Sequence, residues 1–243
     1  MGKETEATKK KKKWPWVVGA IAIVIIIGII GGNSGDKSNT QTSVPNNQSA
    51  KTDSVGGKTE NTKTSSKSDT KKSYKVTLKP GYYEVGIDIP AGTYDFEIKA
   101  GNGNVTTTSG SVNLIMGEQS DDMYQKSYKN AELSAGDTLF VQQCTIKVGS
   151  KSADTAIKGR DNSSAQEISL AAGKYTAGTD FQPGYYNITL TSGSGNVICE
   201  DNQLNAIMSK DSSVGVKEYK NVPFKSGYKL DVESAKIKLT PSK

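Results

Sequence analysis

The sequence predicts an all-β protein in which two tandem small antiparallel β-sandwich or barrel domains follow one transmembrane helix and a disordered linker. Three observations support this prediction: an uncharged apolar stretch, a polar low-complexity stretch after it, and an internal duplication over the remaining residues. The predicted segments are a basic arm at 1–13, a signal-anchor helix at 14–32, a linker at 33–72, a first domain at 73–149, a second linker at 150–164 and a second domain at 165–243.

The apolar stretch from Trp14 to Gly32 contains no charged residue. As a helix it would span roughly 28 Å, which is close to the hydrocarbon thickness of a bilayer. The lysines from Lys9 to Lys13 follow the positive-inside rule, so we expect a cytoplasmic N-terminus and extracellular domains. Two other interpretations stay open: a cleavable signal peptide with a weak cleavage site at 32–34, and a buried core helix.

Residues 33–72 are nearly all serine, threonine, asparagine, glutamine, glycine, lysine and aspartate. This composition cannot bury enough apolar surface to offset the entropy lost on ordering. We therefore expect a disordered tether with an average reach of roughly 35 Å. It would either lift the domains away from the membrane or serve as a solvated connection without a partner of its own.

The remaining chain is duplicated. Residues 78–116 and 170–208 align without a gap at a constant offset of 92 residues. After a shift of one residue the match resumes, with the tripeptide Tyr-Lys-Asn at 128–130 and again at 219–221. About a third of the aligned positions are identical, which is beyond chance at this length.

Each copy shows the pattern of short strands. Tyr94, Phe96 and Ile98 alternate with charged residues, which is the period of a half-buried strand, and residues 186–190 repeat the alternation. Glycine-rich and proline-rich segments between the strands are predicted turns, and Pro183-Gly184 suits the central positions of a type II turn. These turns are predicted at 90–92, 101–104, 183–184 and 192–195.

The motif G-x-Y-x-x-G-x-D-x-x-x-G-x-Y occurs in both copies. It reads VGIDIPAGTY at its centre in the first copy (residues 85–94) and AGTDFQPGYY in the second (residues 177–186). This motif resembles a repeat of surface-exposed proteins of Gram-positive bacteria. The resemblance covers about two-thirds of the chain and implies a β-rich extracellular module attached by a signal anchor or a lipid. It implies no established activity.

Asp88 and Asp180 recur after a glycine and before a turn. They could be ligand-binding or metal-binding carboxylates, but we favour side-chain caps on nearby backbone N–H groups. The further carboxylates that calcium would need are not matched between the copies. No metal site is therefore predicted.

Tyrosine pairs occur at 82–83 and 185–186. Adjacent residues of a strand point to opposite faces, so one member of each pair should be in the core. Exposed tyrosines could stack on sugar rings. We expect Tyr83, Tyr94, Tyr175 and Tyr186 in the core, and Tyr82 and Tyr185 on the surface.

Cys144 and Cys199 are not matched between the copies, which favours small buried fillers over an inter-domain disulfide. The glycine-rich segments at 100–105 and 192–197 resemble phosphate-binding loops superficially. Because a strand and not a helix should follow each, we expect hairpin turns.

The chain has no histidine, the commonest general base and zinc ligand. The net charge of +6 lies in the predicted arm and linker, because residues 73–243 carry about −1. A nucleic-acid-binding domain should carry its positive charge on the folded part, so no nucleic-acid partner is expected. No catalytic residue, cofactor or metal ligand is predicted, and the ligand-binding residues are unknown.

Together these observations predict a non-enzymatic, membrane-anchored surface protein whose tandem β-domains bind or brace a cell-wall polymer, a glycan or an envelope protein. The alternative is an accessory or sensor subunit of a membrane protein complex. In both cases the predicted location is the cell membrane, with one pass and extracellular C-terminal domains.

Overall fold

The protein is known from a computed structural model, which describes residues 71–119 and 122–243. Within these ranges the chain forms strands and one short 3-10 helix, η1 (Glu200–Asn202), and the fold class is all-β as predicted. None of the described residues form a helix that is long and apolar enough to cross a bilayer. The predicted signal-anchor helix at 14–32 and the linker up to residue 70 lie outside the described residues.

The strands fall into two matching sets, which we call repeat 1 (residues 72–153) and repeat 2 (residues 168–241). Repeat 1 contains β1 (Lys72–Leu78), β2 (Gly81–Glu84), β3 (Gly92–Thr107), β4 (Asn113–Gly117), β5 (Ser127–Leu133), β6 (Thr138–Val141) and β7 (Cys144–Ala153). Repeat 2 contains β8 (Ile168–Leu170), β9 (Gly173–Thr176), β10 (Gly184–Gly193), β11 (Gly195–Cys199), β12 (Leu204–Met208), β13 (Glu218–Phe224), β14 (Lys229–Val232) and β15 (Ala235–Pro241).

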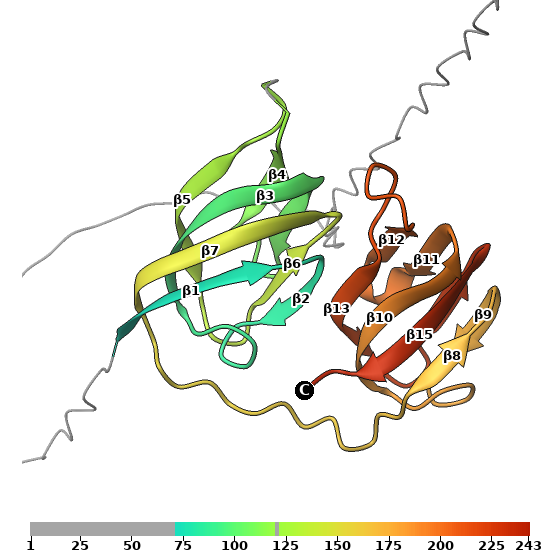
Figure 1. Cartoon of the computed structure of the whole chain (residues 1–243). Coiled ribbons are helices and arrows are strands. Elements are labelled where there is room, and N and C mark those ends of the chain that lie inside the picture. The colour runs from blue at the N-terminus through green and yellow to red at the C-terminus, as the bar shows by residue number, and fades with distance from the viewer. Residues whose placement is uncertain (1–70, 120–121) are drawn as a thin grey trace, which may run out of the picture. The chain divides into compact units, whose positions relative to one another are not determined.

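The strands form two sheets (Figure 1). The larger sheet has eleven strands, with the order β1-β7-β3-β6-β2-β13-β10-β15-β8 and with β4 and β5 paired to β3. The smaller sheet has four strands in the order β12-β11-β14-β9. The named strands inside each repeat pair antiparallel, with a few isolated parallel bridges beside them, whereas β2 of repeat 1 meets β13 of repeat 2 in a parallel bridge.

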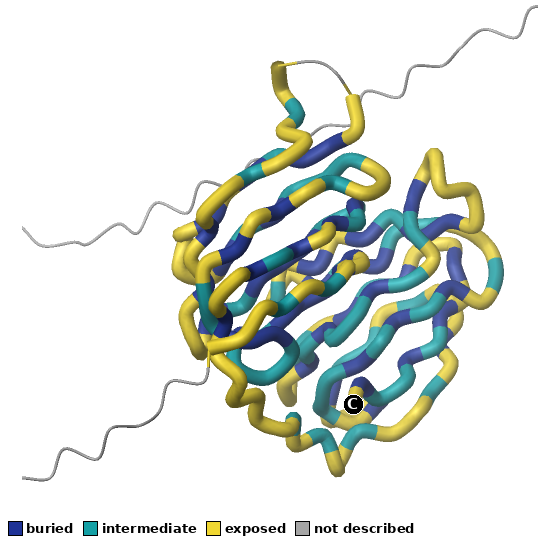
Figure 2. Tube along the Cα trace, turned by 60° about the vertical axis from the view of Figure 1, so that its left-hand side comes forward, coloured by how far each residue is buried: buried dark blue, intermediate teal, exposed yellow. Residues whose placement is uncertain are grey.

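Each repeat has its own group of buried apolar side chains. Along β3 and β10 the chain alternates between buried and more exposed residues, as Figure 2 shows, because successive side chains of a strand point to opposite faces. Tyr94 and Phe96 are buried on β3, as the alternation predicts. The division into two independent domains stays a prediction.

The predicted turns at 101–104 and 192–195 are wrong. Residues 101–104 lie inside β3, which pairs with β5 and β7 before this point and with β4 and β6 after it. The glycines let the strand pass close to another backbone: a Cβ on Gly103 would lie 1.7 Å from the carbonyl oxygen of Gln142. Gly195 has the same relation to Glu233. The glycines of these two segments therefore indicate a close approach of two backbones and not a hairpin turn.

Two further details differ from the sequence prediction. Gly184 begins β10 with φ of 154°, far from the value near +80° that the third residue of a type II turn requires, so Pro183-Gly184 does not form that turn. Strand β7 continues to Ala153, past the predicted limit at 149, because its last residues pair with Gly92 and Lys72.

Candidate functional site: a cleft between the repeats

The repeat-matched aspartates act as side-chain caps. Oδ2 of Asp88 accepts the backbone N–H of Glu84 at 2.8 Å, and Oδ2 of Asp180 accepts that of Thr176 at 2.6 Å. The preferred interpretation of these residues is thus confirmed. Among the described residues no cluster of three or more His, Cys, Asp or Glu side chains could hold a metal ion.

The repeat-matched tyrosines share one structural role. Each donates its hydroxyl hydrogen bond to the carbonyl oxygen four residues upstream, at 2.7–3.0 Å. This bond satisfies the hydrogen-bonding capacity of the phenol when the ring is buried. Tyr83, Tyr94 and Tyr186 are buried as predicted, and Tyr175 is half-buried against the core of repeat 2.

Tyr82 was expected on the surface, and that prediction is wrong. Its side chain is only 7% exposed and stacks on Phe140 with ring centroids 4.1 Å apart. The Tyr82 hydroxyl donates to the carbonyl oxygen of Asn202 in repeat 2 at 3.0 Å. Burial, with Tyr219 and Cys199 nearby, raises the pKa of Tyr82, so the hydroxyl keeps its proton at neutral pH. Tyr82 and Phe140 thus belong to the apolar cluster of repeat 2 although they come from repeat 1.

The corresponding positions in repeat 2 have a different chemistry. Lys174 stands where repeat 1 has Tyr82, and Asp231 stands where it has Phe140. The two form an ion pair on the surface, with the lysine side chain largely in solvent. The aromatic pair through which repeat 1 contacts repeat 2 therefore corresponds to a charged surface pair in repeat 2.

The backbones of the two repeats also meet directly. The N–H of Lys220 on β13 donates to the carbonyl oxygen of Pro80 at 2.8 Å, beside the bridge to Gly81. A Cβ on Gly81 would lie 2.6 Å from the carbonyl oxygen of Lys220. Glycine is required here because any side chain would push the two strands apart.

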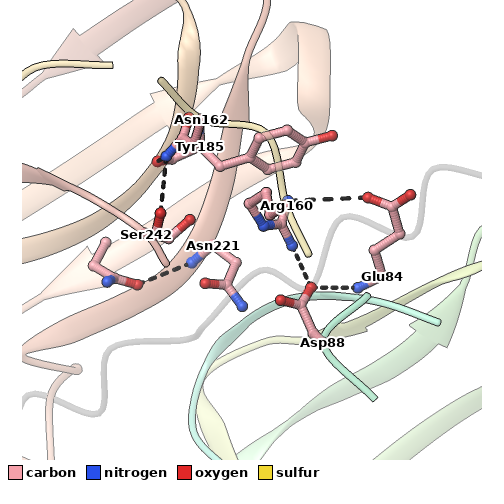
Figure 3. A network of polar contacts seen from close by, with 8 residues as sticks. Glu84, Asp88, Arg160, Asn162, Tyr185, Asn221 and Ser242 are labelled. Atoms are coloured by element: carbon pink, nitrogen blue, oxygen red, sulfur yellow. Dashed lines mark hydrogen bonds and ion pairs between the residues drawn. The ribbon is translucent and has the colours of Figure 1, made fainter. Parts of the chain in front are cut away.

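Arg160, from the segment that joins the repeats, connects them a second time (Figure 3). Its guanidinium forms an ion pair with Asp88 of repeat 1, lies 3.9 Å from Oε2 of Glu84, and has its central carbon 3.9 Å above the ring of Tyr185 in repeat 2. The Arg160 side chain is only 3% exposed, and that of Asp88 10%. Tyr185, expected on the surface, is half-buried under this guanidinium.

Asn162, two residues further on, binds repeat 2 alone (Figure 3). Its side-chain amide donates to the carbonyl oxygens of Tyr185 at 2.7 Å and Ser242 at 3.0 Å, and its oxygen accepts the N–H of Tyr185 at 2.8 Å. The joining segment is therefore held to repeat 1 through Arg160 and to repeat 2 through both residues.

A cleft of about 410 Å³ opens where the repeats and this segment meet. That volume lies in the range of small-molecule sites. Both repeats contribute aromatic rings and hydroxyl or amide side chains to its wall. The lining consists of Tyr82, Glu84, Thr106, Thr107, Thr108, Thr138, Phe140, Arg160, Tyr185, Asp201, Asn202, Gln203, Asn221, Pro223, Lys225 and Tyr228.

The formal charges of the cleft balance. Glu84 lies beside Arg160, Asp201 accepts the backbone N–H of Lys229 at 2.8 Å, and Lys225 adds one positive charge. Several neutral groups of the wall form no hydrogen bond with another described residue. These groups are the hydroxyls of Thr106, Thr138 and Tyr228 and the side-chain amides of Gln203 and Asn221.

Arg160 has unused hydrogen-bonding capacity in this wall. Its Nε and Nη1 atoms are buried and have no hydrogen-bond acceptor. A buried guanidinium whose N–H groups are unpaired costs free energy, so such an arrangement calls for an explanation in function or in the ion pair itself. Arg160 lies outside the duplicated segments, but the sequence does distinguish it, because it is the only arginine in the chain.

Neither cysteine is among the residues that line the cleft. Cys144 and Cys199 are both buried and free, which agrees with the prediction of small core fillers rather than a disulfide. Burial raises the pKa of Cys144 to about 12 and also raises that of Cys199. Neither thiol is therefore a reactive nucleophile in the folded protein.

No protein-family profile matches the chain, and no curated protein sequence matches it. Among solved structures it is matched to a Cupin 2 conserved barrel domain protein from Leptotrichia buccalis, with 13% sequence identity and a TM-score of 0.17. The match covers 69% of this chain and 76% of that one, and at this TM-score it supports no inference about fold or function.

Proposed function

We propose that this chain is a single-pass membrane protein of the bacterial surface, and that its two β-domains bind a neutral, hydroxyl-rich portion of a cell-wall glycan in the cleft between the repeats. The observation that carries the proposal is the cleft itself, which neither repeat could form alone. The apolar stretch at 14–32 and the polar stretch after it supply the anchor and the tether in this proposal.

The wall chemistry supports a sugar over a charged ligand. Sugar rings present C–H faces that pack on aromatic rings and hydroxyls that both donate and accept hydrogen bonds. The cleft offers aromatic side chains beside hydroxyl and amide groups with the same dual capacity. Its formal charges are balanced, so a strongly charged ligand would gain little from them.

Binding is proposed rather than catalysis because the carboxylates of the cleft are already engaged. Glu84 faces Arg160, and Asp201 accepts a backbone N–H. A glycosidase needs one carboxyl group with a raised pKa as acid and a second, free carboxylate across the glycosidic bond. The geometry supports holding a glycan rather than cleaving it.

Retention on isolated cell walls tests the proposal. The full chain, in detergent, should sediment with purified wall at low salt. A cleft variant, Thr106→Val with Tyr228→Phe, removes two free hydroxyls and should lower the retained fraction at least about fivefold, since each lost hydrogen bond costs about 1 kcal/mol. The matched control, Thr93→Val with Tyr128→Phe, alters the same residue types away from the cleft and should bind as the unchanged chain does.

Two results would contradict the proposal. Equal retention of the cleft variant and the control would place any binding surface elsewhere. Protection of both repeats from protease added to intact cells would contradict the proposed topology. Crosslinking in membranes that recovers one constant protein partner, together with no retention on wall, would favour the alternative of an accessory or sensor subunit.

A further inference from the structure

The duplication provides two copies of one loop. We call residues 84–89 the Asp88 loop and residues 176–181 the Asp180 loop. In each, the glycine N–H donates to the carbonyl oxygen three residues later at 2.7 Å, and the aspartate N–H donates to the carbonyl oxygen four residues earlier at 2.8 Å. The glycine φ values are 93° at Gly86 and 87° at Gly178. The two loops therefore have the same local backbone structure.

The Asp88 loop is occupied by the segment that joins the repeats. The N–H of Lys158 donates to the carbonyl oxygen of Gly86 at 2.8 Å, and two residues later the Arg160 guanidinium pairs with the Asp88 carboxylate. Upstream, the N–H of Asp154 donates to the carbonyl oxygen of Ala91 at 2.9 Å. An extended peptide with one arginine thus covers this loop.

The Asp180 loop has no such cover among the described residues. The carbonyl oxygen of Gly178 accepts no hydrogen bond there, and Asp180 is exposed and accepts only the N–H of Thr176. A hollow of about 200 Å³ lies over this loop, lined by Glu167, Ile168 and Phe181 among others. The Asp180 loop therefore combines an open carbonyl oxygen and an exposed carboxylate in a hollow whose wall also includes Ile168 and Phe181.

We propose that the Asp180 loop binds an extended, arginine-bearing segment of a partner protein, in the manner in which residues 158–160 bind the Asp88 loop. The occupant would place one backbone N–H on the Gly178 carbonyl and a guanidinium on Asp180 two residues later. Arginine suits this position because its planar fork matches a carboxylate. Glu167 on the rim is paired with Lys238 at 2.7 Å, so the negative charge that an arginine would meet here is that of Asp180. The site is separate from the proposed glycan cleft, since the two share no lining residue.

The chain supplies its own probe for this site. A synthetic peptide with the sequence of residues 154–161, DTAIKGRD, carries the contacts seen on the Asp88 loop. We expect saturable binding to the full chain in detergent, measured by saturation-transfer NMR on the peptide, with a Kd of about 1 mM or tighter, as a few contacts allow. Replacing the peptide arginine by alanine should weaken binding at least tenfold.

Variants of the protein locate the site. Asp180→Asn keeps an oxygen for the Thr176 N–H but removes the charge, and it should also weaken binding at least tenfold. Asp211→Asn removes another exposed carboxylate of repeat 2 and should leave the Kd unchanged. The proposal is overturned if the peptide shows no saturable signal at about 5 mM, or if its Kd is the same with Asp180→Asn or with the alanine peptide. The wall-retention experiment tests substitutions at other residues, so either proposal can be contradicted without the other.

Discussion

Removal of Arg160 should measure how strongly the joining segment holds the repeats together. Breaking a buried ion pair by deleting one partner typically costs 3–5 kcal/mol because the other charge is left buried. After the substitution Asp88 would still accept the N–H of Glu84, and its side chain is 10% exposed. We therefore expect the cost of leaving Asp88 without its partner to lie at the lower end of this range. The contact with Tyr185 adds about 1 kcal/mol. We therefore expect Arg160→Ala to lower the free energy of unfolding by about 3–4 kcal/mol.

A double-mutant cycle isolates the ion pair from the other contacts. Urea unfolding of the full chain, followed by far-ultraviolet circular dichroism, gives the free energies of the unchanged chain, Arg160→Ala, Asp88→Asn and the double variant. The coupling energy should be about 2 kcal/mol or more. The exposed pair of Lys174 and Asp231, tested with Lys174→Ala and Asp231→Asn, should show no measurable coupling because water and salt screen it.

One result would refute this reasoning. A coupling energy below about 0.5 kcal/mol between Arg160 and Asp88 would put the buried pair in the range of surface pairs. The segment would then be held by its other hydrogen bonds, and the ion pair would not compensate for the unpaired N–H groups of Arg160.

Three further predictions concern the junction and the cores. Gly81→Ala should cost about 2–3 kcal/mol, since its Cβ would meet the Lys220 backbone, whereas Gly173→Ala at the matching position meets a tyrosine hydroxyl at 3.3 Å and should cost clearly less in the same urea assay. Burial alone would raise the pKa of Asp137, but hydrogen bonds from Ser109, Thr108 and Thr138 outweigh it and lower the pKa. The contribution of the Asp137 carboxylate to stability is therefore complete above the ordinary carboxyl pKa and is lost as pH falls through the lowered pKa. Asp137→Asn should make the free energy of unfolding depend less on pH in this acidic range, and an unchanged dependence would contradict the prediction. Cys144 and Cys199 should resist iodoacetamide at pH 8 in the folded protein and react after urea is added, which mass spectrometry would detect; rapid labelling of the folded chain would contradict their burial.

Much of the fold could be predicted because local rules determine it. Alternation around Tyr94 predicted a strand, and the duplication predicted that whatever repeat 1 forms, repeat 2 forms also. The turn predictions at 101–104 and 192–195 failed because glycine serves both turns and close strand crossings, and the sequence alone does not separate the two.

The candidate site was harder to predict, because it depends on contacts between segments far apart in the chain. Tyr82 is buried in the apolar cluster of repeat 2, where its hydroxyl binds Asn202, 120 residues away, so no local pattern could predict its burial. Arg160 lies in the polar stretch between the two copies and has no counterpart in the duplication, so the repeated pattern carries no signal for it. Unmatched residues at a junction can be as informative as matched ones.

The replacement of Tyr82 and Phe140 by Lys174 and Asp231 bears on self-assembly. The contact between the repeats is heterologous, because β2 of one copy meets the β13 position of the next. Contacts of this kind can recur from molecule to molecule and generate fibres. Because a charged pair replaces the stacking rings at the corresponding position of repeat 2, the aromatic contact that joins the repeats has no counterpart there for another copy of the chain.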